Sequence, residues 1–568
     1  MNKLIKIAMF ILIVIRVTLS VWVGIWFPAG QLWDDNLMMR FAGLKAHFFE
    51  PEYFALVKDM SFPLFVRAFS VTKIPYPAVL GLLWSCAALV SYFTFKKILS
   101  GKRQIPFLIF LYVLFMPQAF DIWSGTRLYR NGIIAPFTIM TLMMLISFMI
   151  SCAKAEKWMI IKAIVTGILF SFTYYIKEDG MWLMCTLLFG GILTFSYILF
   201  APDFSRLASR LVCLFIPLLI FGAATVGYKA VNHRFFGVYE INTRTEGELG
   251  KFLEKIYTTD SDNRTYACWT PYDAIEKAFA ASETLSSYPE LLQSIETTDW
   301  RDGDIVKNPI PGDHLGWILR DSLYETGIWE NEKQISDLFA QINLELDEAF
   351  ESGALTRQEG AFQIVKSAGG YTFNEILSLS DDFYEGMLGA VLLKGYESGL
   401  GGVEADEIEE NIVLIEAAEE YTNTDYLDDY SLISDRSKKT EIVLDIIFVI
   451  YRVVNGLLFA ATFIAMIWGI CRFFVYLKKD EKSKKKNQAF LSLLGSVSFF
   501  GISLVYNFAI CWFSAFLFEK EGIVNLTLNF YDIALPGLLM LAYAFAVSFV
   551  YQMIASMESS QRSLKSMG

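Results

Sequence analysis

Three short polar motifs stand at the ends of long apolar runs and carry most of the side chains suited to chemistry. Trp-Asp-Asp occupies 33–35, Thr-Arg-Leu-Tyr-Arg-Asn-Gly spans 126–132, and Lys-Glu-Asp-Gly spans 177–180. A carboxylate can take a proton from a hydroxyl group, and arginine binds phosphate through a fixed fork of donors. The motifs therefore suit proton abstraction beside a bound phosphate.

Each motif also has a plainer interpretation. Asp34 and Asp35 are good helix N-caps and could stay solvated at the start of a helix. The charges of 177–180 could simply keep water at a tight turn between two helices. Arg127 and Arg130 could anchor lipid headgroups, being three residues apart and so on one face of a helix start. The elements that position the motifs decide between these interpretations.

The composition predicts an integral membrane protein. The chain has 568 residues, of which 54% are hydrophobic, and its mean hydropathy is +0.42. An apolar run of about 20 residues is long enough to cross a bilayer as a helix. Ten such runs are present, at 7–27, 76–95, 105–122, 132–151, 159–176, 180–200, 211–230, 442–471, 489–511 and 533–552. We expect an α-helical polytopic protein with about ten transmembrane helices.

The charge is distributed unevenly along the chain. Residues 232–440 hold 42 of the 60 Asp and Glu but only 16 of the 48 Lys and Arg, a net charge of −26. Amphipathic stretches at 335–350 and 404–421 predict a mainly helical soluble domain. We therefore predict a transmembrane module over 1–231, an acidic soluble domain over 232–440 between helices 7 and 8, and a second transmembrane module over 441–568. The acidity of the soluble domain argues against nucleic acid as a partner.

Basic residues predict the orientation of the chain. Lysines and arginines recur beside the N-terminus, in alternate loops, in the run 478–486 and in the C-terminal tail. Such residues favour the cytoplasmic side of a membrane. We expect a multi-pass protein of the cell membrane with both termini cytoplasmic. The three motifs and the acidic domain then share the extracytoplasmic side.

The first loop on that side, about 28–75, is predicted to contain a helix lying in the membrane interface. Leu37, Met38, Phe41, Leu44 and Phe48 keep helical spacing. Pro51 would end this helix. Arg16 lies in the middle of the first apolar run, where a charge needs a partner that the sequence does not name.

Cysteine and histidine chemistry is not indicated. Six of the seven cysteines lie in or beside apolar runs, and the three histidines are far apart in the sequence. No disulfide framework or metal-ligand spacing is present. We therefore predict no metal site and no cofactor, although the carboxylates are groups that could bind a divalent cation.

The combination of motifs and helix layout resembles the GT-C glycosyltransferases, the class that includes protein O-mannosyltransferases and lipid A aminoarabinose transferases. The resemblance rests on Trp-Asp-Asp at 33–35 and on the helices of roughly the first 230 residues. The motifs at 127–132 and 177–182 look like the arginine-bearing and acidic outer motifs of bacterial members. The chain departs from the class in one respect. Members often place the soluble domain at the C-terminus, whereas here it is predicted between helices 7 and 8.

The resemblance implies a polyprenyl-phosphate sugar as donor and a hydroxyl of a cell-surface glycan, lipid or protein as acceptor. Asp35, or its neighbour Asp34, would be the catalytic base, and transfer would proceed with inversion. The other roles that it implies are phosphate binding by Arg127, Arg130 and Lys177, and substrate binding by Glu178, Asp179, Trp33 and Tyr129. Such a protein is expected in the cell envelope, and the lack of disulfide pairs on the outer side is compatible with a bacterium.

Two other function classes fit a protein of this composition. A transporter or flippase for lipid-linked glycans would need polar residues at the bilayer midplane and a repeat between its halves, and no repeat is visible. A non-enzymatic membrane protein could use the acidic domain to bind a partner, with the motifs only capping helices. The position of the motif carboxylates relative to Arg127 and Arg130 discriminates between the enzyme and the partner-binding protein.

Overall fold

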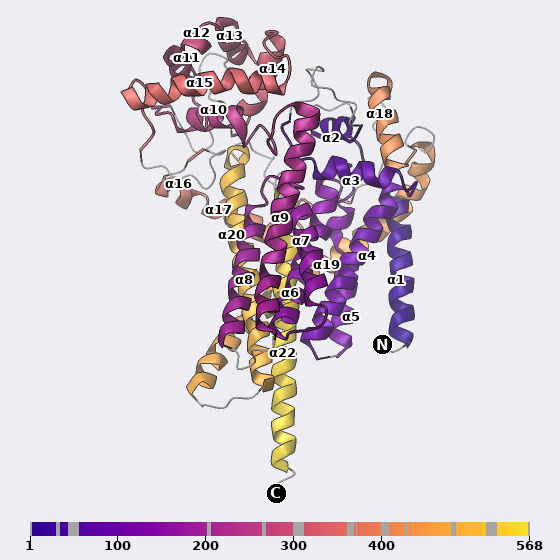
Figure 1. Cartoon of the computed structure of the whole chain (residues 1–568). Coiled ribbons are helices and arrows are strands. Elements are labelled where there is room, and N and C mark those ends of the chain that lie inside the picture. The colour runs from indigo at the N-terminus through magenta and orange to yellow at the C-terminus, as the bar shows by residue number, and fades with distance from the viewer. Residues whose placement is uncertain are drawn as a thin grey trace.

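The computed structural model of the chain is built from helices (Figure 1). It describes residues 3–29, 34–43, 56–100, 102–200, 206–263, 269–298, 310, 312–359, 369–370, 372–398, 408–425, 430–478, 484–518 and 531–565. Within these ranges the extended backbone is limited to isolated β-bridges.

The apolar helices form one bundle. They are α1 (Lys3–Val23), α4 (Tyr76–Ile98), α5 (Gln104–Leu114), α6 (Asn131–Ala153), α7 (Met159–Tyr174), α8 (Met181–Phe200), α9 (Leu207–Phe236), α19 (Tyr430–Lys478), α20 (Lys484–Phe518) and α22 (Leu535–Lys565). Eight helices of the described chain are long and apolar enough to cross a membrane. The multi-pass helical architecture predicted from the sequence is thus confirmed.

The predicted spans 105–122 and 159–176 form the two shorter apolar stretches. In the first, α5 ends at Leu114 and a single 3-10 turn, η1, follows at Pro117–Phe120. Pro117 lacks a backbone N–H and cannot continue the helical hydrogen bonding. The count of ten spans stays a prediction.

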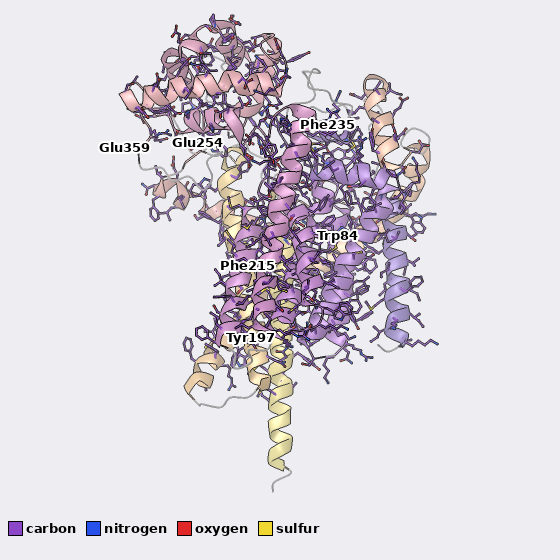
Figure 2. The ribbon with its side chains drawn as sticks, in the orientation of Figure 1. Trp84, Tyr197, Phe215, Phe235, Glu254 and Glu359 are labelled. Atoms are coloured by element: carbon purple, nitrogen blue, oxygen red, sulfur yellow. The ribbon has the colours of Figure 1, made fainter. Side chains whose placement is uncertain are left out.

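Burial follows the position of each helix in the bundle. Most residues of α6 are buried, which makes it a central helix. By contrast, α1, α9 and α19 expose large apolar side chains such as Phe10, Phe215 and Ile464. Phe215 and Tyr197 can be seen along the bundle in Figure 2. Helices that are apolar on their outward faces suit a lipid surrounding.

Six helices beyond α9 form a separate unit, which we call the cap. They are α10 (Gly247–Thr258), α11 (Tyr272–Ala281), α12 (Glu283–Ser286), α13 (Pro289–Thr297), α14 (Leu315–Glu325) and α15 (Glu332–Ser352). They enclose their own hydrophobic core, which includes Trp269 and Phe339. The cap lies at the end of the bundle opposite to the start of α1 and the end of α22 (Figure 1). We call that end of the bundle the capped end.

The rest of the region between α9 and α19 packs against the bundle. It contains α16 (Phe373–Ser378), α17 (Ser380–Leu392) and α18 (Ile408–Thr422). Met387 of α17 and Ile415 of α18 belong to the main hydrophobic core of the bundle, not to that of the cap. The segment predicted as one soluble domain over 232–440 therefore contributes to two hydrophobic cores.

The first loop at the capped end holds two helices, α2 (Asp34–Gly43) and α3 (Ser61–Ser70). The apolar face of α2 is buried, with Met38 and Phe41 at 0% and 1% exposure. It packs against α3 and α18, so protein rather than lipid covers the face that was expected to lie in the membrane interface. Leu44, Phe48 and Pro51 lie outside the described residues.

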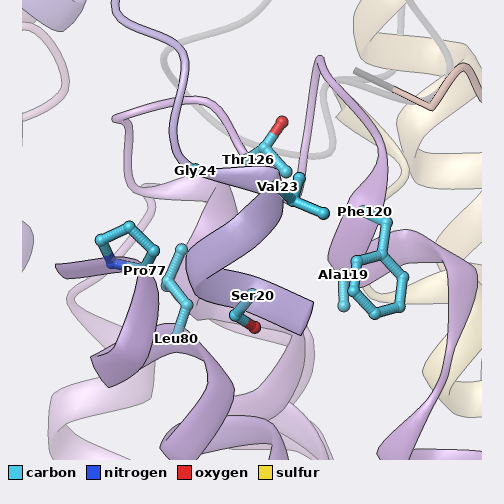
Figure 3. Close-up of a pocket in the computed structure, with 8 residues that line it drawn as sticks. All are labelled: Ser20, Val23, Gly24, Pro77, Leu80, Ala119, Phe120 and Thr126. Carbon is cyan, nitrogen blue, oxygen red and sulfur yellow. The ribbon is translucent and has the colours of Figure 1, made fainter. Parts of the chain in front are cut away.

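Arg16 is buried in α1 and points into the protein. Its Nη1 donates to Ser20 Oγ, and its guanidinium carbon lies 4.3 Å from the centre of the Phe120 ring. Ser20 and Phe120 also line a cavity of about 10 Å³, together with Val23, Gly24, Pro77, Leu80, Ala119 and Thr126 (Figure 3). That volume corresponds to about one water molecule. Thr126, on one wall of this cavity, directly precedes Arg127.

Candidate active site

The loop between η1 and α6 places both motif arginines, and Asp121 braces it. One carboxylate oxygen of Asp121 accepts from the backbone N–H and the hydroxyl of Ser124, at 2.9 and 2.7 Å. The other accepts from the backbone N–H of Glu397 at 2.8 Å. Burial raises the pKa of Asp121 to about 7, against the effect of these hydrogen bonds. A short parallel bridge between Trp26 and Arg127 then fixes the loop against the end of α1.

Asp35 and Arg127, which are 92 residues apart in sequence, form a buried bidentate ion pair. Nε of Arg127 donates to Oδ1 of Asp35 at 2.7 Å, and Nη2 donates to Oδ2. The exposed fractions of the two side chains are 5% for Arg127 and 0% for Asp35. Both oxygens of Asp35 are therefore engaged by one guanidinium group.

Tyr129 lies between the two motif arginines. The guanidinium carbons of Arg127 and Arg130 are 5.5 and 5.1 Å from the centre of its ring. Trp26 flanks Arg127 as well, at 5.6 Å. Tyr129 has no exposed surface, so it serves as packing between two cations, whereas the sequence suggested that it stacks on a sugar.

Glu178 contacts both Arg130 and the connection from α9 to the cap. Nη1 of Arg130 donates to both carboxylate oxygens of Glu178 at 2.7 Å. Nη2 of Arg244, in the connection from α9 to the cap, lies 3.8 Å from Oε2 of Glu178, while its Nη1 donates to Asp313 at 2.8 Å. Burial alone would raise the pKa of Glu178, but the charges of Arg130, Lys58 and Arg244 hold it well below its usual range.

Lys177 and Asp179 turn to the opposite side, toward α20 and α22. Nζ of Lys177 donates to the backbone oxygen of Tyr531 at 3.2 Å and lies 3.8 Å from Asp179. The hydroxyl of Tyr506 donates to Asp179 at 3.3 Å. Burial lowers the pKa of Lys177 and raises that of the neighbouring Asp532. The motif 177–180 thus contributes to two adjacent clusters of charged side chains. Glu178 belongs to the cluster of Arg130, whereas Lys177 and Asp179 form the other cluster.

Several residues of the site were missed in the sequence. They are Lys58, Asp59, Asn242, Arg244, Asp313 and Asp532. Lys58 and Asp59 stand out as adjacent charges in the otherwise apolar stretch 56–66, and this was a signal that could have been used. The other four residues lie just after or just before helices, and the sequence around them has no recognisable motif. Only the fold shows that they lie close to the motif residues.

Two predicted site residues escape description. Trp33 and the side chain of Asp34 lie outside what the structure describes, although the backbone of Asp34 begins α2. Within the described ranges, no three His, Cys, Asp or Glu side chains gather as ligands for a metal ion. Arginine and lysine side chains, which are buried here, are groups that bind anions such as phosphate.

No protein-family description matches the sequence, and neither does any curated protein sequence.

Proposed function

We propose that the protein is a membrane glycosyltransferase that uses a polyprenyl-phosphate sugar and transfers the sugar to a hydroxyl of a cell-surface glycan, lipid or protein. The observation that supports this proposal is the convergence of all three motifs at the capped end. Asp35 meets Arg127, Tyr129 separates Arg127 from Arg130, and Arg130 meets Glu178. Buried arginine and lysine donors at the end of a membrane bundle suit a phosphate whose lipid tail lies among the helices.

The cations have a defined part in this reaction. As the bond between the anomeric carbon and the phosphate oxygen breaks, negative charge develops on the leaving polyprenyl phosphate. Fixed donors in a water-poor site stabilise such charge strongly. We assign this role to Arg130 and Lys177, with Arg127 completing the positive field, and we assign Glu178 and Asp179 to sugar hydroxyls.

The two aspartates of the first motif take different roles in this proposal. Asp35 holds Arg127 with both oxygens, so we assign it to positioning that arginine. Of the two aspartates, Asp34 is then the motif's candidate for the proton acceptor. A single displacement at the anomeric carbon gives inversion, with the acceptor oxygen bonding to carbon, its proton passing to a carboxylate and the phosphate leaving with the electron pair.

The orientation needed for this reaction places the capped end outside the cell. The start of α1 and the end of α22 lie on the opposite side of the molecule from the cap (Figure 1). With the basic loops on the cytoplasmic side, the site would face the outer leaflet of the cell membrane.

A panel of radiolabelled polyprenyl-phosphate hexoses, offered to the purified protein with cell-envelope glycan and lipid acceptors, tests the proposal. Release of polyprenyl phosphate is measured for wild type, Arg130→Lys and the control Asp337→Asn, which lies in an exposed ion pair of the cap. We expect wild type and control to consume one donor and Arg130→Lys to be about 100-fold slower, as for loss of one well-placed donor. A wild-type chain that binds and consumes no donor contradicts the proposal.

One observation favours a second function. The carboxylates of Asp35 and Glu178 have both oxygens occupied by arginine, as expected for ion pairs that only hold a structure together. A non-enzymatic protein that presents the cap to a partner would show this arrangement and no donor consumption in the same experiment.

A further inference from the structure

The segment that leads into α3 is attached to the connection between α9 and the cap. The backbone N–H of Thr243 donates to the backbone oxygen of Leu56 at 2.7 Å. Nδ2 of Asn242 donates to Oδ1 of Asp59 at 2.9 Å. Lys58 lies between Leu56 and Asp59 in the sequence. Its Nζ is 5.2 Å from the centre of the Trp317 ring in the cap. Residues 56–59 are thus placed by contacts from outside their own loop.

Asp59 differs from the other carboxylates of the site in how its oxygens are used. Asp35 and Glu178 each give both oxygens to arginine. Asp59 is only 4% exposed, yet it accepts one hydrogen bond, from Asn242, and forms no ion pair with the described residues. One oxygen is anchored and the other remains available to a substrate hydroxyl.

The charged groups around Asp59 come from three parts of the chain. Glu178 faces it from the turn before α8, Arg130 from the start of α6 and Arg244 from the connection to the cap. Tyr174 and Tyr175, at and just after the end of α7, and Tyr228 of α9 complete these surroundings. Because Glu178 holds the arginines, it keeps its negative charge and discourages a second one on Asp59.

Burial and the charge of Glu178 together raise the pKa of Asp59 to about 7, against the opposing effects of Asn242, Arg130 and Arg244. A general base works best when its pKa lies near the working pH. This agrees with the geometry, which leaves one oxygen of Asp59 available.

We propose that Asp59 is the proton acceptor for the attacking hydroxyl, an inference that rests on the proposed glycosyltransferase function. The acceptor oxygen forms a bond to the anomeric carbon while its proton passes to the open oxygen of Asp59. The bond between the anomeric carbon and the donor phosphate breaks, and polyprenyl phosphate leaves with the electron pair beside Arg130. Asn242 is a positioning residue that fixes the Asp59 carboxylate.

The test compares release of polyprenyl phosphate and binding of the donor in wild type, Asp59→Asn, Asp34→Asn and the control Asp337→Asn. We expect Asp59→Asn to release polyprenyl phosphate at least about 100-fold more slowly, as for loss of a general base. Donor binding should stay within about threefold of wild type, because this residue is not among the proposed phosphate ligands.

Three further variants separate proton transfer from a structural effect. Formate should restore release in Asp59→Ala, because a small carboxylate can take the place of the missing one, but not in Asp34→Ala. Asn242→Ala removes a hydrogen bond to the ionised form of Asp59 and should move the acid limb of the pH profile to higher pH.

The outcomes separate the inference from the function on which it rests. A wild-type chain that consumes no donor overturns the proposed function, and the inference with it. An active wild type with Asp59→Asn within about threefold of it overturns the inference alone. Rescue of Asp34→Ala rather than Asp59→Ala by formate does the same and assigns the proton to Asp34.

Discussion

At the level of single residues, the two buried ion pairs of arginine with a carboxylate hold the site together, and a bound phosphate would have to compete with one of them. Moving an ion pair out of water is costly, and the pair is retained only when its geometry is good. Asp35 with Arg127 and Glu178 with Arg130 both meet that condition, with the carboxylate oxygens fully used. A phosphate that binds Arg130 must share this cation with Glu178. Binding of the donor would therefore change the field around Asp59.

Breaking the Asp35 pair should destabilise the protein strongly. Asp35→Asn leaves the buried guanidinium of Arg127 without its counter-ion, and we expect a loss of about 3 to 5 kcal/mol in the free energy of unfolding. The double variant Asp35→Asn with Arg127→Gln should recover part of this loss because no buried charge is left. Unfolding by denaturant in detergent measures both.

The control for this cycle is Asp337→Asn, which breaks an ion pair whose side chains are 56% and 67% exposed. An exposed pair contributes at most about 1 kcal/mol. If Asp35→Asn unfolds no more easily than this control, Asp35 does not hold Arg127 in solution, and its assignment as a positioning residue is wrong.

At the level of elements, the sequence predicted the helices well and the loops poorly. Hydropathy reflects the solvent around each helix, so apolar runs such as 76–95 and 132–151 correspond closely to α4 and α6. Pairing between loops has no such local signal. Asp35 and Arg127 were predicted to act separately because residues so far apart in sequence meet only once the bundle has formed.

The loop helix shows the same limit. Its apolar spacing predicted a helix correctly over part of 28–75, and α2 is that helix. The spacing says that one face is buried but not by what. The partner, α18, follows more than 360 residues later in the chain, so burial by protein and burial in lipid were indistinguishable in the sequence. The charge of Asp59 stands out in the sequence, but nothing local marks the approach of Asn242, which is 183 residues away in the chain.

Gly125 and Gly180 are the places where the loops of the site allow no side chain. A Cβ atom on Gly180 would lie 2.6 Å from the backbone oxygen of Tyr174, and one on Gly125 would lie 2.6 Å from the backbone carbon of Ala119. Contacts this short with backbone force the loop to move. Gly125→Ala should displace Arg127 and Gly180→Ala should displace Glu178.

We expect each of these alanine variants to lower donor binding at least tenfold and to lower the unfolding temperature. Gly191→Ala is the matched control, because Gly191 lies in α8 and a Cβ atom there meets nothing within 4 Å. Alanine favours a helix over glycine, so this control should keep wild-type stability. Wild-type donor binding in Gly125→Ala would show that the position of Arg127 does not matter for the donor.

At the level of the whole molecule, the cap and its connection to α9 form part of the candidate site. Arg244 and Asn242 lie in that connection, and Trp317 and Asp313 belong to or border α14. The acidic composition of this region predicted a soluble domain but gave no indication that it reaches the motif residues. Its contacts with residues 56–59 suggest that it helps to build the site.

Glu332, at the start of α15, is a residue through which the cap holds the first loop. Its Oε1 accepts from the backbone N–H of Leu56 and from the hydroxyl of Thr243 at 3.0 Å. Nη2 of Arg320 donates to the same hydroxyl at 2.8 Å. Glu332 is 3% exposed, so water cannot readily replace these bonds. This network links the cap, its connection to α9 and the loop that carries Asp59.

Glu332→Ala should therefore release residues 56–59 without unfolding the bundle. An amide that loses its hydrogen-bond acceptor exchanges with solvent through smaller openings of the structure. We expect hydrogen–deuterium exchange over 56–59 to rise at least tenfold while α4 and α6 keep wild-type protection. Glu345→Ala is the matched control, because Glu345 lies on the same helix but accepts hydrogen bonds only inside the cap, from Ser282 and Thr284 among others. Equal exchange over 56–59 in the two variants would mean that the cap does not hold this segment, and that Asp59 is positioned by the bundle alone.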